Sequence, residues 1–121
     1  MKPRYCIVTF AASMLLISVA AMAKDFSESQ MNVFLQFATV TEIAKRCPIY
    51  KVNNLEFGVW SDEVDLTVED VNSEYAKVMV MAMMLGRSKT FDQMTPVRVC
   101  TSAWEKYGVD GDTHPSLLLK R

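Results

Sequence analysis

The chain has 121 residues, half of them hydrophobic, and its 13 Lys and Arg against 14 Asp and Glu give a formal net charge of −1. This near-neutral balance argues against a nucleic-acid-binding protein, which usually presents a strongly basic face. A chain of this length supports one hydrophobic core but hardly two, so we expect a single folded domain.

The first 23 residues are typical of a secretory signal peptide. Lys2 and Arg4 form a basic start, residues 6–20 are an uncharged apolar run, and residues 21–23 (Ala-Met-Ala) match the small-x-small pattern at a cleavage site. The run is shorter than the roughly 20 residues that span a bilayer, so an uncleaved membrane anchor is the weaker alternative. We therefore expect a periplasmic or secreted protein. Its mature chain, residues 24–121, is expected to form a single helical domain that is not attached to the membrane.

Residues 25–46 predict a first long helix, because they contain neither Gly nor Pro and Pro48 stands just beyond their end. An apolar face that includes Phe37 is expected to enter the core and to carry Cys47 at its edge. Glu42 belongs to the opposite side, which we expect to face solvent.

Between residues 48 and 66 the helical periodicity weakens. Asn53 is a suitable cap for a short helix, which we expect to stop at Gly58. Phe57, Val59 and Trp60 are too apolar for an idle loop and are interpreted as a plug over one end of the helices.

A third helix is predicted from Thr67, a good N-cap, to Gly86, which is expected to end it. Acidic residues crowd its start, where the helix dipole favours negative charge, so a solvated helix start explains them better than a binding patch for a cation or a basic partner. Residues 78–85 are apolar all round. Such a stretch is either central in the core or covered by something else.

Methionines dominate this apolar stretch. Their flexible, polarizable side chains suit an adaptable surface for apolar partners, and plain core packing is the alternative. Thioether sulfurs also bind Cu(I), but residues two apart on a helix point away from one another, which weakens that hypothesis. The candidate partner surface consists of Met79, Met81, Met83 and Met84.

A short helix is predicted from Thr95 to Gly108. Thr95 is the expected cap, Pro96 suits the first helical position, and Gly108 suits the left-handed position past the end. The leucines at residues 117–119 are expected to fold back onto the bundle.

The mature chain has two cysteines, Cys47 and Cys100, and in an exported protein we expect them to form a disulfide. A redox pair or a metal site is the weaker reading, because there is no Cys-x-x-Cys motif and His114 is the single histidine. No residue pattern assembles a catalytic site, and we expect neither an enzyme nor a bound cofactor or metal.

Cys47-Pro-Ile-Tyr-Lys-Val-Asn53, the stretch Val99–Gly111 and the closing Pro115–Arg121 resemble small exported proteins of rhizobia and related alphaproteobacteria. The resemblance implies an exported, disulfide-linked helical fold and no activity. The chain departs from that pattern at Val109, where Pro is common, and at Ser116, where Gly is common. A looser likeness, in size and in one disulfide tying two helices, is to the periplasmic acid-stress chaperones of enteric bacteria.

Together these features predict an all-α protein, a small bundle of three main helices plus one short helix tied by one disulfide. The favoured function is a non-enzymatic binding or interaction protein of the cell envelope, with another envelope protein as its partner. The alternatives are an acid-stress-type periplasmic chaperone and a Cu(I)-binding protein that uses the Met cluster.

Overall fold

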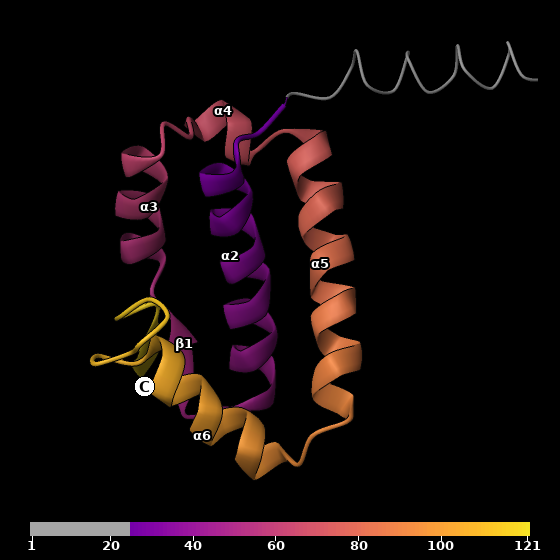
Figure 1. Cartoon of the computed structure of the whole chain (residues 1–121), viewed down its shortest axis with the longest axis vertical. Helices are drawn as coiled ribbons and strands as arrows, with labels where there is room; N and C mark the ends of the chain where they lie inside the picture. Colours follow the sequence, from indigo (N-terminus) through magenta and orange to yellow (C-terminus); the bar gives the residue numbers. More distant parts are fainter. Residues whose placement is uncertain (1–24) are drawn as a thin grey trace, which may run out of the picture.

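The computed structural model describes residues 25–121, so the predicted signal peptide lies outside the described residues. Within this range the protein is mostly helical, which confirms the expected fold class at that level (Figure 1). None of the described helices is long and apolar enough to cross a membrane. The elements in chain order are α2 (Glu28–Arg46), β1 (Tyr50–Val52), α3 (Asn54–Glu63), α4 (Val68–Val71), α5 (Glu74–Asp92), α6 (Pro96–Tyr107) and β2 (Leu118–Lys120).

Helix α2 is the central element, with α3 and α5 on opposite flanks and α6 across its lower end (Figure 1). It begins in a capping box, in which the Gln30 amide donates to Ser27 Oγ and the Ser27 amide donates to Gln30 Oε1. It ends at Arg46, as the sequence predicts. Because α2 has neighbours on several sides, its buried residues are not confined to one stripe.

Glu42 is buried, so the expectation that it faces solvent is wrong. Its Oε1 atom accepts a hydrogen bond from Lys45 Nζ at 3.1 Å, while the Lys45 side chain stays largely in water. A carboxylate tolerates burial when a cation remains within hydrogen-bonding reach. The amphipathic pattern of α2 does not reveal this, because it takes no account of the hydrogen bond between Lys45 and Glu42.

A small antiparallel sheet joins the segment that follows α2 to the C-terminal end of the chain. Tyr50 in β1 lies opposite Lys120 in β2, and Val52 lies opposite Leu118. Each strand has only three residues, too few for a visible alternating pattern. The neighbouring Leu117 is fully buried, as is Leu118, which confirms that the C-terminal leucines fold back onto the helices.

Helix α3 starts as expected, with Asn53 Oδ1 accepting from the Glu56 amide, but it does not stop at Gly58. It continues to Glu63, because a glycine inside a helix costs only about 1 kcal/mol and the next turn brings Trp60 against the core. Phe57 is buried as the plug hypothesis requires. Val59 points outward instead.

The helix predicted from Thr67 to Gly86 is in fact two helices. Thr67 caps α4 as expected, through reciprocal bonds with Asp70. The chain then breaks at residues 72–73, because Ser73 Oγ accepts from the Ala76 amide and begins a new helix. Gly86 lies inside α5, which runs on to Asp92, so its predicted role as a helix end is wrong.

Helix α6 has the bounds that the sequence predicts, with Gly108 just past its end, but the conformation of this glycine differs from the prediction. Thr95 caps it and Pro96 occupies the first turn. Gly108 has a φ of −71°, so it is not in the left-handed region. A glycine is required at position 108 for a different reason, because a Cβ there would lie 2.6 Å from an atom of the Trp104 ring.

The predicted disulfide is confirmed. Cys47, at the end of α2, is bonded to Cys100 in α6, with an S–S distance of 2.03 Å and a Cα–Cα distance of 5.8 Å. Nearby, Tyr50 stacks on Trp104 with ring centroids 5.2 Å apart. The disulfide, the small sheet and the buried face of α6 form one region, which we call the clasp.

Candidate functional site

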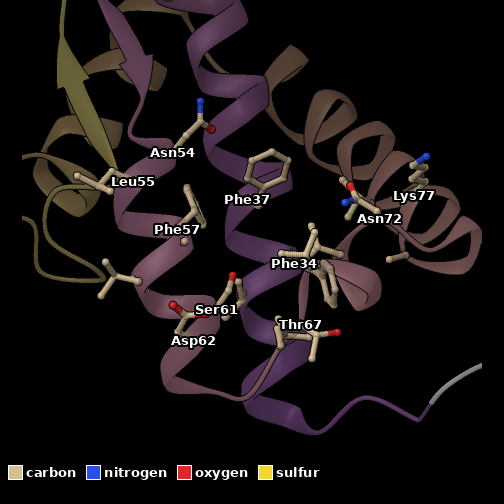
Figure 2. Close-up of a pocket in the computed structure, with 18 of the residues that line it drawn as sticks. Phe34, Phe37, Asn54, Leu55, Phe57, Ser61, Asp62, Thr67, Asn72 and Lys77 are labelled. Carbon is tan, nitrogen blue, oxygen red and sulfur yellow. The ribbon is translucent and has the colours of Figure 1, made fainter.

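A wide apolar groove lies over the first half of α2 (Figure 2). Its volume is about 950 Å³, within the range of ligand-binding clefts. Helix α2 forms the floor, α3 forms one wall, and α4 with the start of α5 forms the other. The lining side chains are mainly apolar, and they include Val33, Phe34, Phe37, Leu55, Phe57, Val59, Leu66, Val68, Val71, Ala76, Val80 and Met81.

The floor is built from aromatic residues that hold one another in place. Phe34 and Phe37 project from α2 between the two walls (Figure 2). The Phe37 ring meets Phe57 of α3 edge-on, with centroids 5.2 Å apart, and Phe34 lies 5.0 Å from Phe26. Such pairs add about 0.5–1.5 kcal/mol beyond simple burial, so the floor is a firm surface.

The α3 wall exposes apolar side chains that have no neighbour in the chain to cover them. Leu55 is 80 % exposed, and Val59, one helical turn later, is also exposed. Gly58 lies between them on the groove, and nothing would stand within 4 Å of a Cβ built there. The end of this wall is fixed to α2, because Gln30 Nε2 donates to the Val64 carbonyl at 3.0 Å.

The opposite wall is equally apolar. Val68 on α4 is 77 % exposed and Met81 on α5 is 69 % exposed, although both line the groove. Below them, Arg87 Nε donates to Thr39 Oγ1, and Arg46 pairs with Asp92 at 2.7 Å, so polar contacts tie α5 to α2. The groove therefore lies between walls that are each anchored to its floor.

One end of the groove is strongly acidic. Residues 62–74, which link α3 through α4 to α5, contain six carboxylates and no Lys or Arg. Asp70 is turned into the α4 cap, and the other five are exposed. None of these five takes part in the ion pairs seen among residues 25–121. On the groove wall itself, Asp62 stands on α3 and Lys77 on α5 (Figure 2).

The four methionines singled out from the sequence are separated by the helix. Met81 lies in the groove, Met79 and Met83 are partly buried against the core, and Met84 is half-buried. Together with Met81, Val78 and Leu85 are exposed on the outer side of α5. This helix is thus peripheral, and of its residues only Ala76 is buried.

Titratable groups of chemical interest lie outside the groove. Tyr107 donates a 2.6 Å hydrogen bond to Gln36 Oε1, and burial raises the pKa of this tyrosine above its usual value. His114 stacks on Trp60 and lies 3.3 Å from Glu56 Oε1, which fastens the C-terminal segment to α3. Among residues 25–121, no group of three or more His, Cys, Asp or Glu side chains is arranged to hold a metal ion.

Sequence reasoning missed most of the groove. Leu55 received no role, Val59 was assigned to a plug, and Val68 was placed in a helix that continues unbroken. The one sequence feature that could have indicated the groove is the mixture of acidic and apolar residues in the two short helices at residues 54–71. That pattern predicts helices at the surface, but it does not predict that a groove separates α3 from α4.

Comparison of the chain with protein-family models, with curated proteins and with solved structures gives no match in any of the three. The groove's own geometry and chemistry therefore carry the functional argument.

Proposed function

We propose that this protein is an exported, non-enzymatic binding protein of the cell envelope, and that the apolar groove is its binding surface. In this proposal the three long helices and the shorter α3 form the scaffold that keeps the groove open. The observation that carries the proposal is the exposure of Leu55, Val68 and Met81 on facing walls of one groove. Contiguous exposed apolar patches on soluble domains commonly mark interaction sites.

The position of α5 supports the same conclusion. The sequence shows a helix segment that is apolar all round, and in the structure that segment lies at the edge of the molecule. A helix of this composition is stable in water when another surface covers it. Val78, Met81 and Leu85 extend the apolar surface of the groove around the outside of α5.

Export is supported by two features of the chain. Residues 1–23 have the composition of a signal peptide, and Cys47 is bonded to Cys100. Disulfides persist mainly in oxidising compartments such as the periplasm.

Site-specific photocrosslinking in the native host tests the proposal. A photoreactive amino acid at position 55, in the groove, is compared with the same amino acid at position 97, on α6. Leu55 and Val97 are similarly exposed, at 80 % and 77 %, so the two positions differ mainly in location. We expect defined adducts from position 55 and none from position 97. Equal labelling at the two positions, or none at either, would contradict the proposal.

A client-binding chaperone of the acid-stress kind is a second candidate, favoured by the breadth of the apolar surface beyond the groove. Such a chaperone uses a wide adaptable surface, and the exposed Val78, Met81 and Leu85 supply one. Aggregation of a periplasmic client at about pH 3 and about pH 7 separates the two roles, because acid exposes client surfaces. If the protein does not protect the client from aggregation at either pH, the chaperone role is excluded.

A further inference from the structure

We infer that the groove binds one kind of partner, an amphipathic α-helix of another protein, about two turns long, with Lys or Arg at the end that lies beside α4. This inference rests on the proposed function, because it names the occupant of the same groove. It follows from the groove's shape, from its lack of backbone partners and from its charge.

The shape of the groove fits a helix. A helix with side chains is about 10 Å across and rises 1.5 Å per residue, so about 950 Å³ corresponds to roughly two turns. The floor and both walls are themselves helical, and Leu55 and Val59 form a ridge one turn apart. A bound helix would pack its own ridge between these walls and complete a four-helix arrangement with α2, α3 and α5.

The backbone chemistry of the groove disfavours an extended peptide. An extended segment must find hydrogen-bond partners for its own N–H and C=O groups, which are costly to bury unpaired. The groove is lined by helices, and the small β1–β2 sheet lies in the clasp. A helix satisfies its backbone internally and needs only apolar contacts from the groove.

Charge gives the bound helix its direction and argues against a lipid. Asp62 lines the groove, and Glu69 and Glu74 stand on the adjoining α4–α5 segment. These acidic groups outnumber Lys77, the one cation among the described residues of the groove wall, so a partner gains by placing cations at this end. Fatty acids and anionic phospholipids carry a net negative charge, which these carboxylates repel. Exposed ion pairs are individually weak, so the acidic end mainly sets orientation and association rate, while apolar contact supplies the affinity.

Synthetic helical peptides provide the test. Three 14-residue peptides share one apolar stripe: the first has two Lys at one end, the second has two Glu at that end, and the third has the Lys composition with the stripe scrambled. Binding to the purified, oxidised protein is followed by fluorescence anisotropy. We expect the Lys peptide to bind at least about tenfold more tightly than the Glu peptide, a difference of about 1.4 kcal/mol. The difference should shrink as salt rises, and the scrambled peptide should not bind.

Matched variants locate the site. Leu55→Gln with Val68→Gln changes two exposed residues on facing walls, and Val97→Gln with Val109→Gln changes two exposed residues outside the groove. We expect the first pair to abolish binding of the Lys peptide and the second pair to leave it unchanged. Replacing Asp62 and Glu69 by Lys should reverse the preference, so that the Glu peptide binds better. Equal effects of the two Gln pairs would overturn the assignment of the site.

The remaining outcomes separate this inference from the proposed function. If no peptide binds but palmitate does, or if sedimentation shows a dimer that Leu55→Gln with Val68→Gln dissociates, the helix inference is wrong and the groove still binds something. If position 55 also gives no adduct in the host, both fail together. Equal binding of the Lys and Glu peptides would overturn the assigned direction.

Discussion

The clasp and the groove both involve the central helix α2, but they differ in how far their apolar side chains are exposed to water. In the clasp, Leu117 and Leu118 are withdrawn from water completely. In the groove, Leu55 and Val68 remain largely in water although they face one another across a cleft. Burial and the disulfide stabilise the first region, whereas the walls of the second keep exposed apolar side chains above a floor that includes the buried Phe34. The difference is that apolar surface is buried in the clasp and left exposed on the groove walls, where we propose that a partner binds.

Removing the disulfide should have the largest effect on stability. The bond links residues 53 positions apart, and in the chain-entropy model its loss costs about 4 kcal/mol. For a domain of this size that corresponds to a fall in Tm on the order of 20 °C. The measurement is thermal unfolding of oxidised protein, reduced protein and the Cys47→Ser/Cys100→Ser variant. Equal melting temperatures would show that the clasp does not hold the fold together.

One substitution made in both regions tests the contrast directly. Leu118→Ala empties a fully buried site and should lower the free energy of unfolding by about 3 kcal/mol. Leu55→Ala removes the same atoms from an exposed site and should change it by less than about 0.5 kcal/mol. Urea unfolding of the two variants measures both values. A similar loss in both would mean that the groove wall is part of the stabilising core.

Two glycines give effects of opposite sign. Gly108→Ala should destabilise by about 2 kcal/mol, since the new Cβ would lie 2.6 Å from the Trp104 ring. Gly86→Ala should stabilise by about 0.5–1 kcal/mol, because Gly86 lies inside α5 with open space around it. Thermal unfolding distinguishes them. Destabilisation by Gly86→Ala would restore the interpretation of Gly86 as a helix end.

The effect expected of Tyr107→Phe is modest, and it depends on pH. Near neutral pH, loss of the hydrogen bond to Gln36 should cost about 1 kcal/mol. Burial raises the pKa of Tyr107 in the folded state above its ordinary 10.0, so the fold favours the neutral phenol. The contribution of Tyr107 to the stability of the wild-type protein is therefore retained below pH 10 and lost as pH rises through the raised pKa. The difference between variant and wild type should shrink in alkali, and urea unfolding from about pH 7 to about pH 11 checks it. A constant difference would contradict the assigned burial effect.

The parts of the fold that the sequence predicts are those specified locally or by elimination. Ser, Thr and Pro at helix starts act on the next turn, which is why the sequence predicts the start of α6 at Thr95. Cys47 and Cys100 are the two cysteines that follow the predicted signal peptide, so they leave one pairing. The break at Ser73 was missed because two equally good caps compete within a few residues, and a periodic apolar pattern runs through both.

The groove depends on long-range arrangement instead. By residue type alone, Leu55 and Val59 are expected in the core. They are exposed because α3 and α5 lie on opposite flanks of α2. The exposure of α5 has the same origin. Its composition indicates that it needs a cover, but whether that cover lies within the chain depends on three-dimensional packing.

The pairing of β1 with β2 also sets an order in time. Residues 50–52 must wait for residues 118–120, whereas α2, α3 and α5 meet through shorter separations along the chain. Contacts between distant residues form slowly, because a long loop must close first. A chain that emerges from its N-terminus can therefore bring α2, α3 and α5 together before β2 is available to pair with β1. Cys100 follows α5 in the chain, so we also expect the disulfide to form after α2 and α5 have met.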